Sequence, residues 1–216
     1  LYYGSASALT LTANWTDEIY QLFARFGYSV CTAGDVNNGG YSDIIVGSYL
    51  FDNGHTDEGR VYVYYGSSVG LTAEGFWTAE VNQTYAYFGY SVSNAGDVNG
   101  DGFSDVIVGS QLNDAGGSNS GEAYIFYGGA SMNNTPDVTM AGGAADNYFG
   151  TSVSSAGDYN GDGYDDIIVG CLDGGFASNN YFTGAMIFFG SENGLISIYA
   201  NYCHLDVPMY SIQSFG

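Results

Sequence analysis

A nine-residue pattern occurs three times in this chain, beginning at Asp35, Asp97 and Asp158. Asp or Asn stands at positions 1, 3 and 9 of every copy and Asp at position 5 of two copies, with Gly at position 6. Alternate oxygen-bearing side chains can turn inward around a hard cation, and the glycine permits the sharp bend that this requires. Each copy is therefore predicted to be a Ca²⁺-binding loop.

Two of the loops carry a complete set of predicted ligands. These are the side chains of Asp97, Asn99, Asp101 and Asp105 with the Phe103 carbonyl, and the side chains of Asp158, Asn160, Asp162 and Asp166 with the Tyr164 carbonyl. The remaining loop has Gly39 at position 5, which leaves Asp35, Asn37, Asp43 and the Tyr41 carbonyl. A missing carboxylate removes charge and one ligand, so two strong calcium sites and one weaker site are predicted. The alternative without metal is an Asx-rich turn closed by hydrogen bonds, in which the convergent carboxylates would repel one another.

The loops belong to a longer repeat. Phe-Gly pairs at Phe26, Phe88 and Phe149 each stand nine residues before a loop, and an Ile/Val run ending in Gly follows each loop. A second apolar run closes each unit, ending at Tyr65-Gly66, Tyr127-Gly128 and Phe189-Gly190. A fixed period of this length indicates one supersecondary unit stacked many times. The predicted division is the end of a preceding unit at 1–25, full units at 26–87, 88–148 and 149–209, and the start of another at 210–216.

Each unit is predicted to contain four short strands, because its apolar runs are brief, β-branched or aromatic, and separated by glycines. The fourth strand is the weakest and is expected around Trp77, Val138 and Ile196. Trp15-Thr16 stands 11 residues after Gly4, as Trp77-Thr78 stands 11 after Gly66, so it is assigned to the same strand of the opening unit. The predicted fold is all-β, a β-propeller of four-stranded antiparallel blades. A β-sandwich is the alternative.

The charge balance restricts the partners of the chain. It has 23 acidic residues against two arginines, for a net charge of −21. Such a surface repels nucleic acid and anionic membranes, and no apolar run approaches the roughly 20 residues of a membrane helix. Because loop sites of this kind need abundant Ca²⁺, an extracellular or cell-surface location is predicted. Three cysteines (Cys31, Cys171 and Cys203) leave the disulfide pairing open, and Asn14, Asn82 and Asn133 begin sequons that permit glycosylation.

Phe-Gly, then an Asp-x-Asn-x-Asp-Gly-x-x-Asp loop and an Ile-Ile-Val-Gly run, resembles the FG-GAP repeat. That repeat builds the seven-bladed propeller at the head of integrin α subunits and occurs in many secreted microbial proteins. The resemblance covers the three full units and both partial ends. It implies a calcium-binding propeller that acts in extracellular recognition or adhesion.

No enzymatic function is predicted. His55 and His204 belong to no recognisable motif and are expected at the surface, and Asp165, the extra carboxylate at position 8 of its loop, is expected to face solvent. A protein or glycan ligand is instead expected on one rim of the propeller, at the loop residues Tyr49, Phe51, Asp52, Asp57, Glu58, Asp114, Asp173, Phe176, Tyr181 and Phe182. The leading hypothesis is an adhesion or scaffold module. The alternatives are a lectin-like propeller and the accessory propeller of a larger secreted hydrolase.

The number of units also predicts assembly. Three full blades with fragments do not close a ring, since propellers have at least four blades. The ring is expected to be completed by the remainder of a longer chain, by a second copy in a homo-oligomer, or by head-to-tail addition that produces a filament.

Overall fold

The computed structural model describes residues 1–2, 12–72, 76–172 and 184–202. These residues contain strands and connecting loops but no helix, which confirms the all-β prediction. The strands are β1 (Ser29–Gly34), β2 (Asp43–Ser48), β3 (Arg60–Tyr64), β4 (Trp77–Glu80), β5 (Phe88–Gly96), β6 (Asp105–Ser110), β7 (Glu122–Phe126), β8 (Val138–Ala141), β9 (Ser152–Gly157), β10 (Asp166–Cys171), β11 (Gly184–Phe189) and β12 (Ile196–Tyr202).

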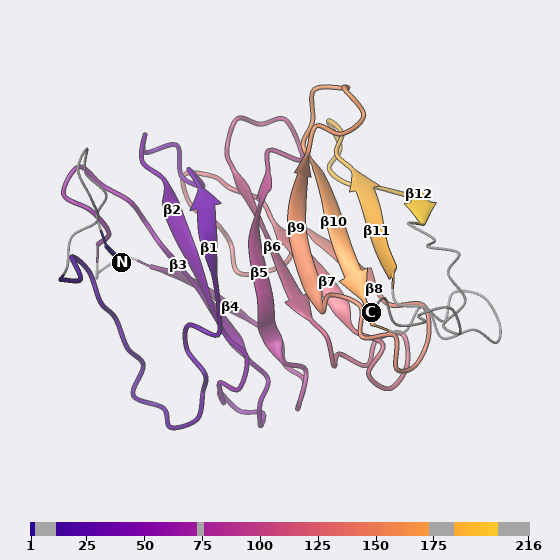
Figure 1. The fold of residues 1–216 in the computed structure, drawn as a ribbon, viewed down its shortest axis with the longest axis horizontal. Helices are drawn as coiled ribbons and strands as arrows, with labels where there is room; N and C mark the ends of the chain where they lie inside the picture. The colour runs from indigo at the N-terminus through magenta and orange to yellow at the C-terminus, as the bar shows by residue number, and fades with distance from the viewer. Residues whose placement is uncertain (3–11, 73–75, 173–183, 203–216) are drawn as a thin grey trace, which may run out of the picture.

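The strands form three four-stranded antiparallel sheets in which consecutive strands are neighbours: β1 to β4, β5 to β8 and β9 to β12. The three sheets stand in a row, and the first strands β1, β5 and β9 adjoin one another across the sheet boundaries (Figure 1). This is the arrangement of successive propeller blades, in which the first strands lie nearest the axis. A two-layered β-sandwich does not describe three sheets stacked in this way.

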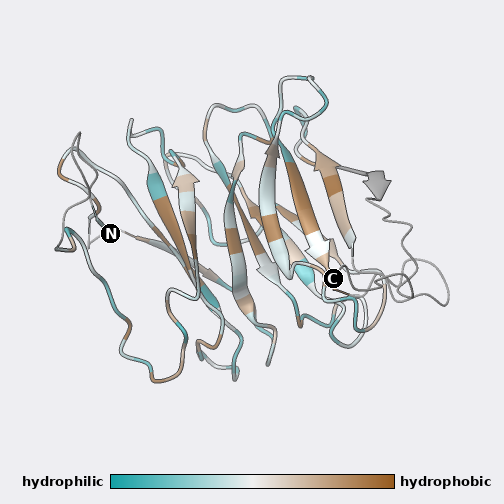
Figure 2. Ribbon diagram, viewed as in Figure 1, coloured by the Kyte–Doolittle hydropathy of each residue, from teal (hydrophilic) through white to brown (hydrophobic). Residues whose placement is uncertain are grey.

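The second strand of each sheet is an apolar run, and in the first two sheets it is covered on both faces. In β6 every residue from Asp105 to Ser110 is buried, and β2 has one residue that is only partly buried. Figure 2 shows hydrophobic residues concentrated in the strands, whereas the connecting loops are mostly pale or hydrophilic. The Ile/Val run after each predicted loop thus forms the second strand of its sheet, and continuous apolar runs are typical of strands covered on both faces.

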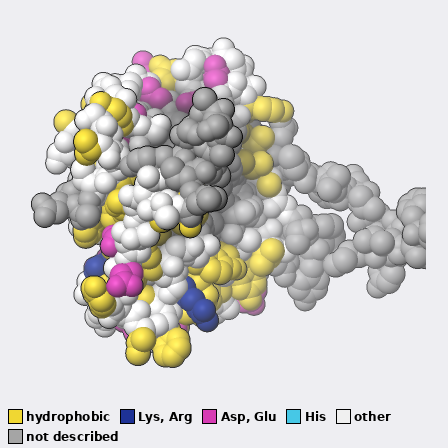
Figure 3. Space-filling view, turned by 60° about the vertical axis from the view of Figure 1, so that its left-hand side comes forward, with side chains coloured by type: hydrophobic (Ala, Val, Ile, Leu, Met, Phe, Trp, Pro, Cys, Tyr) yellow, Lys and Arg dark blue, Asp and Glu magenta, His cyan; other side chains and the backbone are white. Residues whose placement is uncertain are grey.

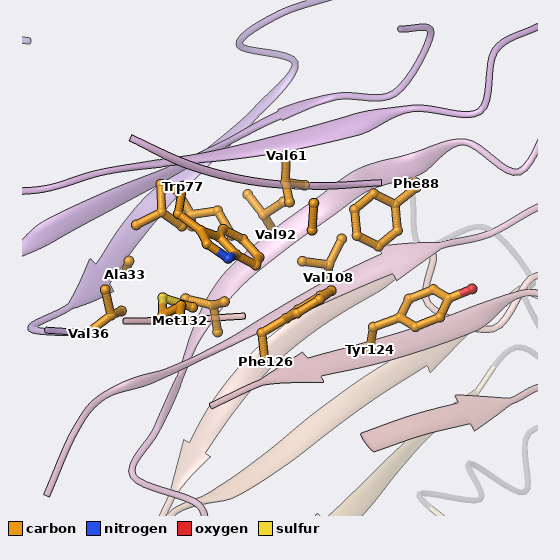
Figure 4. Packing of buried hydrophobic residues seen from close by; sticks show 14 residues of the cluster. Ala33, Val36, Val61, Trp77, Phe88, Val92, Val108, Tyr124, Phe126 and Met132 are labelled. Atoms are coloured by element: carbon orange, nitrogen blue, oxygen red, sulfur yellow. The ribbon is translucent and has the colours of Figure 1, made fainter. Parts of the chain in front are cut away.

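The core lies between the sheets. Val61 and Trp77 of the first sheet pack toward Val92, Val108 and other apolar residues of the second (Figure 4). The Trp77 ring meets Phe126 edge-on, with 5.0 Å between ring centroids. A similar cluster joins the second and third sheets. Stacking the sheets therefore buries the apolar surface that no single sheet could bury alone.

The Phe-Gly pairs make this close stacking possible. Phe88 and Phe149 are almost completely buried between consecutive sheets. The glycine after each phenylalanine presents its carbonyl to a glycine in the second strand of the preceding sheet. A Cβ added to Gly47 would lie 2.1 Å from the Gly89 oxygen, and one on Gly109 would lie 2.0 Å from the Gly150 oxygen. Gly47 and Gly109, in the Ile/Val runs of the first two sheets, are thus required by backbone contact between sheets.

Residues 12–25 form no strand, so the strand expected at Trp15-Thr16 is absent as a regular element. Leu1 pairs with this segment: its amino group donates to the Trp15 carbonyl, and its carbonyl accepts from Asn14 (both 2.9 Å). Trp15 nevertheless packs edge-on against Tyr64, with 4.9 Å between ring centroids. This contact repeats the packing of Trp77 on Phe126 one period earlier.

The outward face of the first sheet is less covered than the face it shows to the second sheet. Val30 is 64% exposed, whereas Val92, at the equivalent place in the second sheet, is 6% exposed. Figure 3 brings this side of the molecule forward and shows hydrophobic side chains at its surface. The part of the chain that the structure describes contains no helix able to span a membrane.

Candidate metal-binding loops

The three predicted loops join the first strand of each sheet to the second. They lie at the same end of all three sheets, at the top in Figure 1. Position 1 organises the turn: the Asp97 carboxylate accepts the backbone N–H groups of Asp101 and Gly102 at 3.0 and 2.9 Å. Asp35 and Asp158 accept the equivalent groups of their own loops at 2.8 to 3.0 Å. The first carboxylate therefore has the same place in all three loops.

Positions 3 and 5 turn toward the same side as position 1. Asn99 accepts the Asp101 N–H through its Oδ1 and donates from Nδ2 to the Asp101 carboxylate, both at 2.9 Å. Asn160 and Asp162 repeat both contacts at 2.8 and 2.9 Å. Each acceptor oxygen has a second lone pair, so these hydrogen bonds leave a site for a cation on the same oxygens.

The loop backbone bends to the left-handed region twice. Gly at position 6 has a positive φ in every loop, as predicted, with 81° at Gly40 and 90° at Gly102. Position 4 also has a positive φ, and this requirement was missed: the residues are Asn38 at 56° and Gly100 at 73° in the first two loops. Asn and Gly at position 4 were the available signal, because these residues tolerate that conformation best.

Position 9 is buried beneath the loop. Asp105 is fully buried and accepts the N–H of Val98 at 2.9 Å and that of Gly128, just after β7, at 2.8 Å. Asp43 and Asp166 are equally buried and make the equivalent pair of bonds at 2.7 to 3.0 Å. The ninth residue thus connects its loop to the end of the third strand.

The carboxylates of one loop interact electrostatically. Burial raises the pKa of Asp105 to about 7; the two N–H donors oppose this shift, and the negative charges of Asp101 and Asp97 add to it. Burial likewise raises the pKa of Asp43, with a further contribution from Asp35. A bound cation would neutralise this repulsion, since an opposite charge favours the ionised form.

Within the described ranges, no three side chains of Asp, Glu, His or Cys converge closely enough to hold a metal ion as they stand. The donor set nevertheless fits Ca²⁺: hard oxygen ligands at positions 1, 3, 5 and 9, on a backbone frame repeated three times. Binding would require positions 1 and 5 to approach the buried carboxylate at position 9.

Comparison with known proteins agrees with this geometry. The FG-GAP repeat family matches residues 26–64, 88–126 and 149–185. The chain belongs to the FG-GAP repeat family. Integrin alpha-5 of Xenopus laevis is 32% identical over 174 residues, covering 78% of this chain and 15% of that protein. Integrin alpha-6 of Homo sapiens is 33% identical over 157 residues, covering 70% and 13%. The chain thus spans about one seventh of the length of these relatives.

The first FG-GAP loop retains the frame of the others although it lacks the fifth carboxylate. The Gly39 N–H donates to both Asp35 and Asn37 at 2.8 Å, as the Asp101 N–H donates to Asp97 and Asn99. A Cβ on Gly39 would lie 2.6 Å from the Asn37 Oδ1. The weaker calcium site predicted here remains a prediction.

Asp165, expected to face solvent, instead contacts the neighbouring FG-GAP loop. Its carboxylate accepts the N–H of Asp97 at 2.8 Å, and its own N–H donates to the Asp97 carbonyl at 3.1 Å. Sequence reasoning missed this role because the partner lies 68 residues away in the chain. Ser104 at the same position of the second loop, also a hydrogen-bonding residue, was the only hint.

The predicted ligand rim lies at the opposite end of the FG-GAP sheets from the metal loops, because its residues follow β2 and β6. The prediction that Glu58 faces a ligand is wrong, because this residue is fully buried and its carboxylate accepts the Asn53 N–H. The Arg60 guanidinium lies over the Phe51 ring, 4.0 Å from its centroid. Tyr49 belongs to a cluster with Tyr28, Tyr87 and Tyr90, defined by ring-centroid distances of 4.6 to 5.3 Å.

Several other predictions concern the surface. Asp52, Asp114 and His55 are exposed, and Asp57 is half-buried. The sequon residues Asn14, Asn82 and Asn133 are also exposed, and Cys31 is a free thiol beside Ser93. Asp173, Phe176, Tyr181, Phe182, Cys203 and His204 lie outside the described residues.

Proposed function

We propose that this chain is a calcium-binding segment of an extracellular β-propeller that acts in adhesion or as a scaffold and is not an enzyme. The observation that supports this most directly is the threefold repetition of one oxygen-lined loop at the same end of three blades. The proposed blades are 26–87, 88–148 and 149–209, with 1–25 and 210–216 belonging to neighbouring blades. Trp15 packs on the first sheet as Trp77 packs on the second, which supports this division.

Calcium has a structural role in this proposal. The ligands of the second site are Asp97, Asn99, Asp101, Asp105 and the Phe103 carbonyl, and the corresponding residues form the third and the weaker first site. Ca²⁺ supplies positive charge and oxygen coordination. The chain's own residues do the rest: position 1 closes the turn, and position 9 fastens it to the third strand.

The proposed recognition surface is the rim opposite the metal loops. The relatives are integrin α subunits, and their family resemblance implies recognition outside the cell. A protein ligand at this rim is the leading proposal. The exposed Tyr28 and its three tyrosine neighbours support a second one, a glycan, because sugar rings stack on aromatic faces. A glycan array separates the two: selective binding that is lost in Tyr28→Ala would favour the lectin.

We also propose that more of the same protein completes the propeller, as a further part of a longer chain, a second copy, or successive copies in a filament. Exposure of Val30 on the first sheet supports this, because its equivalent Val92 is buried by the neighbouring blade. An apolar sheet face of this kind invites association.

Thermal unfolding tests the calcium proposal. Excess EGTA should lower Tm by several degrees or more and added Ca²⁺ should restore it, because a ligand that binds only the folded form stabilises it by mass action. Asp101→Ala should reproduce much of the loss, since it removes a carboxylate ligand. Gly39→Ala, at the same position of the first loop, is the matched control and removes no ligand. A melting curve that EGTA leaves unchanged would refute the proposal.

A further inference from the structure

The metal loops of consecutive blades are hydrogen-bonded to one another. Asp165, at position 8 of the third loop, exchanges two hydrogen bonds with Asp97, the first residue of the second loop (2.8 and 3.1 Å). Ser104, at position 8 of the second loop, makes the same pair of bonds with Asp35, the first residue of the first loop (3.2 and 3.1 Å). In the second and third loops, the residue at position 8 therefore bonds to the residue that carries the first predicted ligand of the loop before it.

A second link runs through the end of the third strand. Gly128 donates its N–H to Asp105 of its own loop at 2.8 Å, and the next residue, Gly129, donates to the Val36 carbonyl of the preceding loop at 2.7 Å. Gly190 and Ser191 repeat this one blade later, donating to Asp166 and to the Val98 carbonyl at 3.0 Å each. Two adjacent N–H groups thus connect the residue at position 9 of one loop with the residue at position 2 of the preceding loop.

The sequence leaves room for this contact. A Cβ on Gly96 would lie 2.2 Å from the Asp165 carboxylate, and a Cβ on Gly100 would lie 2.5 Å from the Tyr164 ring. Gly96 has a φ of +83° and Gly100 one of +73°, so glycine is favoured by backbone conformation as well as by space. Residues 7 and 8 of the third loop therefore pack directly on the second loop.

We propose that Asp165 is a positioning residue for the calcium site of the preceding blade, and that the sites are coupled in a series along the chain. This inference rests on the proposed calcium binding. Ordering the third loop around its ion fixes Asp165, which fixes the Asp97 backbone and hence its carboxylate. Ser104 passes the effect from the second loop to the first. Coupling between two binding sites is reciprocal, so calcium binding along the row should be positively cooperative.

Calorimetric Ca²⁺ titration of a double-mutant cycle tests the proposal. In an Asp162→Ala background, where the second loop is the remaining strong site, Asp165→Ala should lower the affinity roughly tenfold, as expected for loss of a hydrogen bond to a charged acceptor. In an Asp101→Ala background, where the third loop remains, Asp165→Ala should change the affinity far less. Asp165→Asn keeps an acceptor oxygen and should restore most of the affinity of the second loop.

Amide exchange provides a readout that needs no calcium. In EGTA, the Asp97 amide should exchange faster in Asp165→Ala than in the unaltered chain or in Asp165→Asn. If Asp165→Ala leaves the second loop unaffected, or weakens only the third, the inference is overturned while the proposed function stands. If the unaltered chain binds no Ca²⁺ in the first titration, both fail together.

Discussion

At the scale of single residues, each loop combines a buried carboxylate with carboxylates near the surface. Asp105 is fully buried, yet Asp101 is exposed four residues earlier. The buried group accepts the N–H groups of Val98 and Gly128, whereas the Asp101 carboxylate accepts its hydrogen bonds from Asn99 and Phe103 of its own loop. Position 9 therefore fixes the hairpin, whereas the residue type at position 5 determines how many carboxylates the loop has.

Position 5 offers a gain-of-function test. Gly39→Asp should convert the first loop into a third strong site and raise its Ca²⁺ affinity by at least about tenfold, because affinity depends on the number of charged ligands. The Asn37 side chain must move to admit the new Cβ, but Asn99 accommodates Asp101 at the same place in the second loop. Calorimetry should count three strong sites in this variant and two in the unaltered chain. Gly39→Asn, which adds an uncharged side chain, is the control; an equal gain in that variant would contradict the charge argument.

At the scale of elements, the second strands contribute close backbone contacts between blades. Each carries a glycine one residue before its end, and among the described residues Gly47 and Gly109 meet the backbone of the following sheet. A Cβ on Gly109 would collide with the Gly150 carbonyl, whereas one on Gly170 would approach only the Ser152 side chain within 3.6 Å. The same sequence position is therefore constrained differently along the row.

This difference predicts unequal effects of one substitution. Gly109→Ala should destabilise the chain by about 1–3 kcal/mol, the usual cost of overpacking, because the obstacle is backbone that cannot rotate away. Gly170→Ala should cost much less, since a serine hydroxyl can change rotamer. Denaturant unfolding of the 216-residue chain measures both free energies of unfolding. Equal losses would mean that the contact with Gly150 does not limit how closely the sheets pack.

At the scale of the whole molecule, apolar surface is buried between sheets and remains partly exposed on the first one. The row Val92, Val108 and Tyr124 is buried against the first sheet, and its counterpart in the first sheet begins with the exposed Val30. Trp15 and Ile19 cover Val46, Tyr62 and Tyr64 on that face but leave Val30 open. This face therefore resembles the buried faces between blades, but it is only partly covered.

Association should respond to this face specifically. Val30→Glu should leave Tm within about 1–2 °C, since exposed substitutions cost little, and should weaken any concentration-dependent association. Val92→Ala, at the equivalent buried position, should lower stability because it leaves a cavity, with the outer face unchanged. Sedimentation velocity at several concentrations measures the association. If Val30→Glu associates as the unaltered chain does, the first sheet is not the contact surface.

The sequence alone determined the local features of this protein. The Ile/Val runs predicted β2, β6 and β10, the Phe-Gly pairs marked the start of each sheet, and the glycine at position 6 predicted the left-handed bend. These inferences succeeded because strand and turn preferences depend on the residues themselves and on neighbours within a few positions. The repeat then predicted that consecutive sheets stack in chain order, because each unit has the same apolar faces to bury against its neighbours.

Tertiary structure decided what depends on residues far apart. Sequence reasoning expected Asp165 in solvent and Glu58 at a rim, yet one contacts a loop 68 residues away and the other is fully buried. Trp15 belongs to no strand but packs against Tyr64. Burial and hydrogen bonding of such residues depend on how the sheets stack, and the stacking brings together groups that are separated by a whole repeat.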